Sequence, residues 1–127
     1  MGQNCIGIER LLVHGSQYDE LFEIFEKCVE KMRVGSVMAP GQAGYLSTVE
    51  GGAMLSNARF RGLEKLIKDA AEANAYVVGG EEYKHPYHEH GYYFTPTVVG
   101  PVEASMDIAQ QERMSLPDSQ CSLVRCH

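Results

Sequence analysis

The stretch RLLVHGSQYDELFEIFEKCVEKMR, residues 10–33, contains a strand pattern followed directly by a helix pattern. A short apolar run at residues 11–13 ends at a glycine and a serine, which is typical of a strand bounded by a turn. From residue 17 onward, apolar residues recur at steps of three and four, so the spacing predicts an amphipathic helix over 17–33. The face that we expect to be buried consists of Tyr18, Leu21, Phe22, Phe25, Cys28, Val29 and Met32.

A second helix and strand are predicted in residues 56–80. Ser56 is a good N-cap, and the helix after it has a buried stripe made of Leu63, Leu66, Ile67 and Ala70. Asn74 suits the left-handed position that ends a helix, because asparagine tolerates a positive φ. The apolar run 75–78 then predicts a strand that ends at a Gly-Gly turn.

The third predicted strand lies in YYFTPTVVG, residues 92–100, with Pro96 at a strand end or a sheet edge. The order is therefore strand, helix, a long glycine-rich loop at 34–53, helix, strand, loop and strand. This alternation predicts an α/β fold with a short, mainly parallel sheet flanked by helices. In residues 113–127 the apolar residues do not recur at a helix or strand period. We therefore expect these residues to form a disordered tail after a folded part that comprises residues 1–112.

Size and composition set limits on function. The chain has 127 residues, enough for one domain, and a net charge of −6, which argues against nucleic acid as a partner. Its apolar runs are far too short to span a membrane, and the N-terminus lacks a signal-peptide pattern. The cysteines at 5, 28, 121 and 126 form no CxxC pair, so we expect reduced thiols in a cytoplasmic protein and core packing for Cys28.

Cys5 follows Gly2, Gln3 and Asn4, and a short helical turn after it would place the thiol at a helix N-terminus. Free amides at such a position lower the pKa of a thiol and can also bind the oxyanion formed on an attacked carbonyl. A single cysteine in a tetrapeptide is nevertheless more often structural than catalytic, so the residues alone leave both roles open.

The segment GQNCIGIER, residues 2–10, resembles the G-Q-x-C-x-x-x-x-R signature around the catalytic cysteine of the aldehyde dehydrogenase superfamily. The resemblance continues in order through residues 10–35 and 52–80. It ends with GYYFTPTVVGPVEASMDIAQQE, residues 91–112, which is similar to the family's G-x-[FY]-x-x-P-T strand and the acidic segment before E-x-F-G-P. Within this family, the amino-acid sequence most resembles that of fungal members.

This resemblance implies a partial three-layer catalytic domain and a role for each matching residue. Cys5 matches the nucleophile that adds to an aldehyde, Gln3 and Asn4 match the turn that presents the thiol, and Glu112 matches the glutamate that holds the nicotinamide ribose. The implied reaction is oxidation of a small-molecule aldehyde to a carboxylic acid. It proceeds through a thiohemiacetal and a thioester, with NAD or NADP as cofactor and no metal.

The chain also departs from the family pattern. After Glu112 it continues Arg113-Met114-Ser115 instead of x-F-G-P, and residues 36–50 replace a shorter loop. The cofactor-binding half, the E-L-G-G-K glutamate that serves as general base and the oxyanion-hole asparagine have no counterpart. We therefore expect a fragment that is inactive alone. Two alternatives stay open: a non-catalytic remnant that self-associates through uncovered faces, and a bare reactive thiol that forms adducts without oxidising anything.

Other candidate sites carry less weight. His85, His88 and His90 have spacing that can bind zinc or copper, but a solvated loop ahead of a strand is the preferred interpretation, and we expect no metal there. Cys121, Cys126 and His127 are too loosely spaced to predict a metal site. The glycines of residues 41–52 do not form a phosphate-binding loop, and Gly79-Gly80 is expected to be a plain turn.

Overall fold

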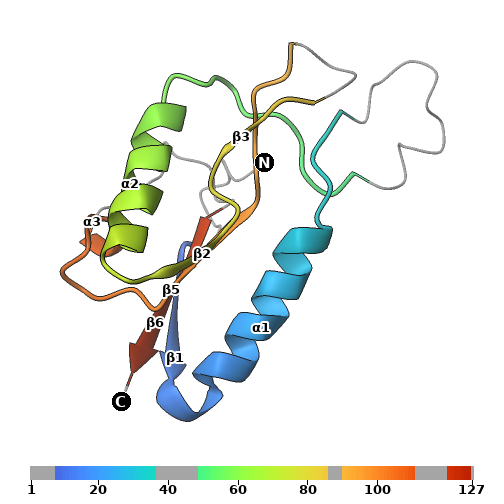
Figure 1. The fold of residues 1–127 in the computed structure, drawn as a ribbon. Helices are drawn as coiled ribbons and strands as arrows, with labels where there is room; N and C mark the ends of the chain where they lie inside the picture. Colours follow the sequence, from blue (N-terminus) through green and yellow to red (C-terminus); the bar gives the residue numbers. More distant parts are fainter. Residues whose placement is uncertain (1–7, 37–48, 86–89, 111–119, 127) are drawn as a thin grey trace.

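The computed structural model describes residues 8–36, 49–85, 90–110 and 120–126. In chain order the elements are β1 (Arg10–His14), α1 (Gly15–Lys31), α2 (Phe60–Glu72), β2 (Tyr76–Val78), β3 (Glu82–Tyr83), β4 (Tyr93–Phe94), β5 (Thr97–Gly100), α3 (Asp107–Gln110) and β6 (Gln120–Cys126) (Figure 1). Alternating helices and short strands confirm the predicted α/β class.

Four strands form the main sheet, in the order β1-β6-β5-β2. β6 pairs in parallel with both β1 and β5, whereas β2 pairs antiparallel with β5. The sheet is therefore mainly parallel, as expected. β3 and β4 form a separate antiparallel pair.

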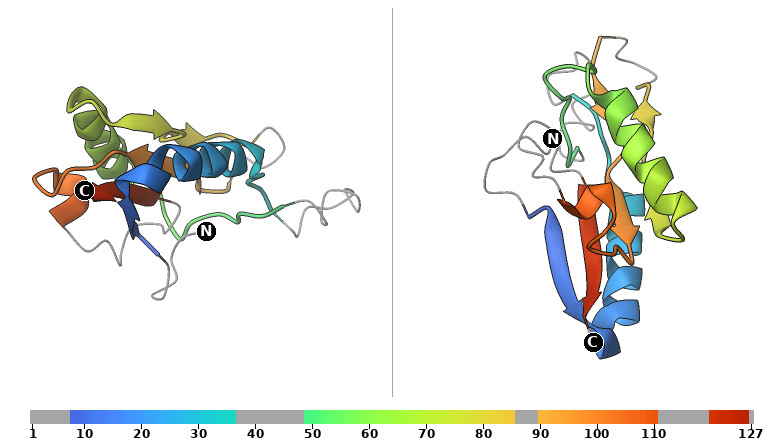
Figure 2. Two further views of the ribbon diagram at one scale, coloured as in Figure 1. Left: turned by 90° about the horizontal axis from the view of Figure 1, so that it is seen from below. Right: turned by 90° about the vertical axis from the view of Figure 1, so that its left-hand side faces the viewer.

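The helices cover opposite faces of this sheet. Val98 of β5 and Leu123 of β6 pack in one cluster with Tyr18 and Phe22 of α1. The next residue of β5, Val99, points to the other face, where its cluster contains residues of α2 and α3. The result is three layers, α1, sheet and then α2 with α3, and Figures 1 and 2 show the strands between the two long helices.

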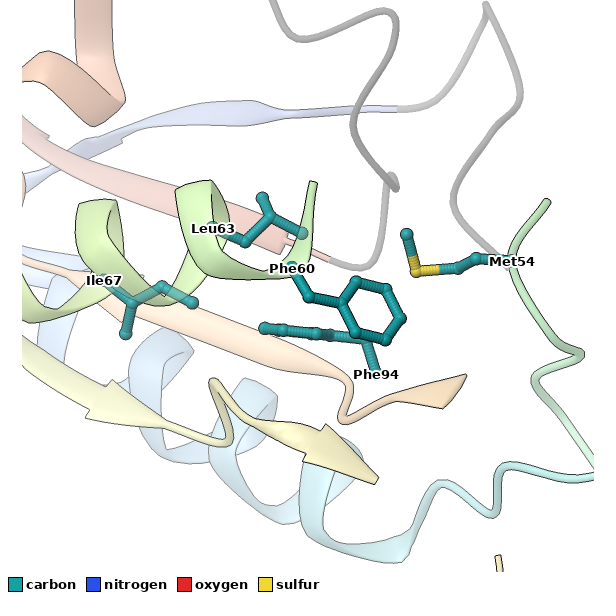
Figure 3. Packing of buried hydrophobic residues seen from close by; sticks show 5 residues of the cluster. All are labelled: Met54, Phe60, Leu63, Ile67 and Phe94. Carbon is teal, nitrogen blue, oxygen red and sulfur yellow. The ribbon is translucent and has the colours of Figure 1, made fainter. Parts of the chain in front are cut away.

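A third cluster joins α2 to the β3–β4 end of the molecule (Figure 3). The rings of Phe60 and Phe94 meet edge to face, with centroids 5.2 Å apart, and Leu63 is fully buried beside them. Met54 closes this cluster from the segment that precedes α2. Edge-to-face aromatic contacts add to the stability gained from the buried area, so this cluster anchors the start of α2.

The largest difference from expectation concerns the tail. Residues 120–126 form β6, which lies between β1 and β5 in the middle of the sheet, so the expectation of disorder is wrong for this segment. Leu123 is fully buried against α1, and both of its partner strands are distant in sequence. A strand that depends on such nonlocal pairing has no local signature beyond its composition. The predicted boundary after residue 112 lies outside the described residues.

Two expectations about helices are also corrected. α2 begins at Phe60 with Arg59 at its N-cap, and not at Ser56 as predicted, because residues 58 and 59 form a turn. On α1, Cys28 is exposed and not part of the core. At 100° per residue, Cys28 lies roughly 80° from Tyr18, at the margin of the buried stripe that passes through Tyr18 and Phe22.

The predicted turn residues are confirmed. Asn74 has φ 68° directly after α2, and Gly79 and Gly80 both have positive φ after β2. Pro96 immediately precedes β5, which agrees with its expected place at a strand end. These residues fix where α2 turns into β2 and where β2 leaves the sheet.

Candidate active site

The residues assigned to chemistry from the sequence, Gln3, Asn4, Cys5 and Glu112, all lie outside the described residues. Their geometry is therefore untested and their roles stay predictions. The structure does describe the segments that lead to them. β1 begins at Arg10, five residues after Cys5, and α3 ends at Gln110, two residues before Glu112.

These two flanking segments are in direct contact. The Nη1 atom of Arg10 donates a hydrogen bond to the backbone carbonyl of Ala109 in α3, across 99 positions of sequence. Arg10 is also the arginine that ends the G-Q-x-C-x-x-x-x-R signature. The fold thus brings together β1, which follows Cys5 in the sequence, and α3, which precedes Glu112.

A hollow of about 330 Å³ lies between the carboxyl end of α1, the end of β2 and the turn before β5. Its walls are mainly apolar, with charged groups on the side of α1, and are made by Val29, Glu30, Met32, Arg33, Val34, Val78, Gly79, Tyr83, Thr95 and Pro96. Among these residues there is no cysteine, serine or histidine, and the hydroxyl of Thr95 donates to the backbone carbonyl of Glu81.

Arg33, on one wall of the hollow, is bonded to Glu50. Its Nη2 atom lies 3.0 Å from Oε1 of Glu50, and its backbone amide donates to Oε2 at 2.8 Å. The side-chain bond from Arg33, followed by its backbone bond, lowers the pKa of Glu50. The amide of Gly35 donates to the carbonyl of Gly51, and the amides of Glu50 and Gly51 donate to the carbonyl of Arg33, so the two ends of the long loop are held together.

The Gly79-Gly80 turn is filled by its neighbours. A Cβ atom on Gly79 would overlap the carbonyl of Pro96. The amides of Gly80 and Glu81 both donate to Oγ1 of Thr95, at 2.9 and 3.0 Å. Because these amides already have an acceptor, the turn offers no cradle for a phosphate. Within the described ranges, the Gly79-Gly80 turn thus gives NAD(P) no binding loop.

The histidine segment is more ordered at its start than expected. His85 is 5% exposed, and its ring contacts Tyr83 and Tyr93 at centroid distances of 5.9 and 5.7 Å. A solvated loop is therefore wrong for His85, whereas His90 is exposed and His88 lies outside the described residues. The part of the chain that the structure describes contains no group of three possible metal ligands.

Sequence reasoning missed the contacts made by Arg10, Arg33 and Thr95. The sequence feature that could have pointed to Arg10 is its position in the signature, five residues after Cys5. Arg33 and Glu50 carried no signal, because they lie 17 positions apart across a loop. Thr95 also carried no signal, because the amides that it accepts lie 14 and 15 positions away in the sequence.

The layers and strand order define an α/β protein, and the comparisons with known proteins identify its family. The model of the aldehyde dehydrogenase family matches residues 1–114, so the chain belongs to this family. An aldehyde dehydrogenase-like protein of Saccharomyces cerevisiae is 41% identical over 112 residues, and one of Schizosaccharomyces pombe is 39% identical over the same length. Each alignment covers 87% of this chain.

The chain spans only part of these relatives. The alignments cover 17% of the S. cerevisiae protein and 20% of the S. pombe protein. A solved 3,6-anhydro-L-galactose dehydrogenase, in complex with NADP, superposes with a TM-score of 0.78 at 30% identity, over 98% of this chain and 24% of that one. The fold therefore matches one portion of an aldehyde dehydrogenase.

In the described residues, no helix is long and apolar enough to cross a membrane.

Proposed function

We propose that this chain is part of the catalytic domain of an NAD(P)-dependent aldehyde dehydrogenase, with Cys5 as its nucleophile. The observation that carries the proposal is the family match over residues 1–114, which includes both Cys5 and Glu112. The contact between Arg10 and Ala109 agrees with it, because it joins β1, which follows Cys5 in the sequence, to α3, which precedes Glu112.

In this proposal the thiolate of Cys5 adds to the carbonyl carbon of a small-molecule aldehyde. The carbonyl oxygen takes up a proton, and the product is a thiohemiacetal. Gln3 and Asn4 belong to the turn that presents the thiol, and the amide of Cys5 is a donor to the developing oxyanion. This addition is reversible and needs no cofactor.

Oxidation needs a hydride acceptor, which NAD(P) supplies in the whole protein. Glu112 is the residue of this chain that we assign to the nicotinamide ribose. The Gly79-Gly80 turn offers no binding loop for the nucleotide, because the amides of Gly80 and Glu81 are bonded to Thr95. We therefore expect no aldehyde-dependent NADH formation by the 127-residue chain. Turnover that disappears in Cys5→Ser would contradict this expectation.

The rate of alkylation tests the role of Cys5 directly. Iodoacetamide labelling at pH 7, followed by mass spectrometry of each cysteine, compares Cys5 with Cys28, which is exposed on α1. A thiol pKa lowered by one unit, offset by weaker nucleophilicity, gives roughly threefold faster labelling. If Cys5 reacts no faster than a free cysteine, the proposed nucleophile is wrong.

A second candidate function is a non-catalytic remnant that self-associates. It is favoured by large apolar side chains on the surface: Leu12 is 76% exposed and Ile8 is 66% exposed. In the described part of the chain, the outer edge of β1 has no strand beside it. Exposed edges and apolar patches promote association. A compact monomer on size-exclusion chromatography, with cooperative melting, would exclude this candidate, whereas an oligomer that Leu12→Lys dissociates supports it.

A further inference from the structure

The outer edge of β1 can pair with another strand. On one side β1 pairs with β6, and among the strands that the structure describes none pairs with its other side. An edge strand presents backbone amides and carbonyls to which a further strand can bind. Residues 10–14 include no proline and no lysine, the residues with which proteins commonly block such an edge. β1 thus lacks this protection against strand addition.

Leu12 is the exposed apolar residue of this edge. Side chains alternate along a strand, and Leu11 and Val13 pack against α1, so Leu12 points to the opposite face. Leu12 is 76% exposed there, whereas its partner in β6, Val124, packs against the cluster of α2 and α3. The apolar surface of the sheet therefore continues outward to Leu12, where a strand added at β1 would cover it.

The side chains of β1 match those of a second β1 in one antiparallel register. With Leu12 opposite Leu12 of the second copy, Leu11 lies opposite Val13, and Arg10 lies opposite His14. Opposite residues point to the same face, because each pair is symmetric about residue 12. The pairs of Leu11 with Val13 extend the core beneath α1, and the two Leu12 side chains cover each other on the other face. No pair sets an apolar residue against a charged one.

The neighbouring registers do not match in this way. A register centred on Leu11 would place Glu9 opposite Val13, which is buried against α1. A register centred on Val13 would place Leu11 opposite Gly15, the first residue of α1, where the strand has ended. Burial of one face fixes the register of a strand, so we expect β1 to select the register centred on Leu12.

We propose that β1 binds β1 of a second copy of this chain, antiparallel and with the two Leu12 side chains on the two-fold axis. The two four-stranded sheets then form one continuous sheet, with both copies of α1 on the same face. Both copies use the same surface, so association ends at the dimer. This inference rests on the second candidate function, self-association, and names its surface and its partner. The paired strands are short, so we expect a dissociation constant of about 10–100 µM.

Disulfide trapping in the 127-residue chain tests the register. Directly opposite Cα atoms in antiparallel strands lie about 4.5 or 5.5 Å apart, and both distances allow a disulfide. Leu12→Cys should therefore cross-link to itself in a glutathione redox buffer. Leu55→Cys, at an 85% exposed leucine before α2, is the matched control. The tryptic peptides 11–27 and 34–59 contain the new cysteines and none of the native ones, so mass spectrometry can compare the two links. We expect about tenfold more of the link between two residues 12.

Light scattering under reducing conditions measures association without disulfides. Above the expected dissociation constant, the wild-type chain and Leu55→Lys should be dimers. Leu12→Lys should be a monomer, because it places two like charges on the axis. Circular dichroism shows whether each variant is folded. Well below the dissociation constant, substitution of Leu12 should leave the melting of the monomer nearly unchanged, because the side chain is exposed there.

Each outcome decides the proposal. A dimer that Leu12→Lys dissociates, together with the preferred link between residues 12, supports it. A monomeric wild-type chain overturns it together with the second candidate function. An oligomer that Leu12→Lys leaves intact, or equal links at residues 12 and 55, overturns the proposed pairing and leaves self-association through another surface, so the two failures are distinguishable. If Leu12→Lys does not fold, the comparison of the disulfides decides.

Discussion

Leu123→Ala tests the least expected feature of this fold, the place of β6 in the centre of the sheet. Leu123 is fully buried, and it belongs to a cluster with Val13, Tyr18 and Val98. Its backbone carbonyl also accepts the amide of Val102 at 2.9 Å, a bond that the substitution leaves in place. The change therefore removes side-chain packing only.

The expected loss follows from the size of the cavity. Truncation of a fully buried leucine to alanine costs about 3 kcal/mol, within a range of about 2–5 kcal/mol. A domain of this size has a free energy of unfolding of about 5–15 kcal/mol, so the variant loses a large share of it. The same loss corresponds to a melting temperature lower by roughly 10 °C.

Urea unfolding followed by circular dichroism measures this loss, and Leu12→Ala is the matched control. Leu12 lies in the neighbouring strand β1, but its side chain is 76% exposed, so its truncation should cost less than about 1 kcal/mol. An unchanged urea dependence of the free energy would show that both variants unfold from the same compact state.

A small effect would refute the reasoning. If Leu123→Ala loses no more stability than Leu12→Ala, residue 123 is not enclosed between α1 and the sheet. The strand order β1-β6-β5-β2 would then be wrong, and β1 would have no partner among the strands described.

Three further predictions concern two glycines and a carboxylate. Gly79→Ala should destabilise the protein by about 2 kcal/mol or more, because φ is +82° and the new methyl group meets the Pro96 carbonyl. Gly62→Ala, in open space on α2, should instead stabilise it by about 0.5–1 kcal/mol in the same melts. The bond from Arg33 lowers the folded pKa of Glu50, so its stabilising effect is present above the unfolded pKa of about 4.3 and is lost as pH falls through the folded value. NMR titration of the Glu50 carboxyl should show a pKa that returns toward its ordinary value in Arg33→Met, and equal values in both proteins would contradict this.

Much of the candidate site was predictable only through resemblance. A cysteine after Gly-Gln-Asn has a plausible chemistry by itself, but the residues alone did not separate a nucleophile from a structural thiol. The family match over residues 1–114 supports the resemblance. The positions of Cys5 and Glu112 remain predictions, since neither lies among the described residues.

Local patterns by themselves determined the two long helices, the turns and the α/β class, but not the short helix α3. The period of three and four marked α1, and Asn74 and Gly79 marked turns, because each depends on the conformational preferences of residues close in sequence. Such preferences act over one or two turns of chain. They therefore also place a helix boundary only to within a few residues, as the later start of α2 shows.

The tertiary structure alone decided which distant segments meet. β6 joins β1 to β5 through pairings that span more than twenty positions of sequence, and Arg10 reaches Ala109 across 99. The burial of His85 beside Tyr83 and Tyr93 was likewise fixed by neighbours that no local pattern specifies. Pairing and burial depend on the summed fit of nonlocal surfaces, so their physical cause appears only when the chain is folded.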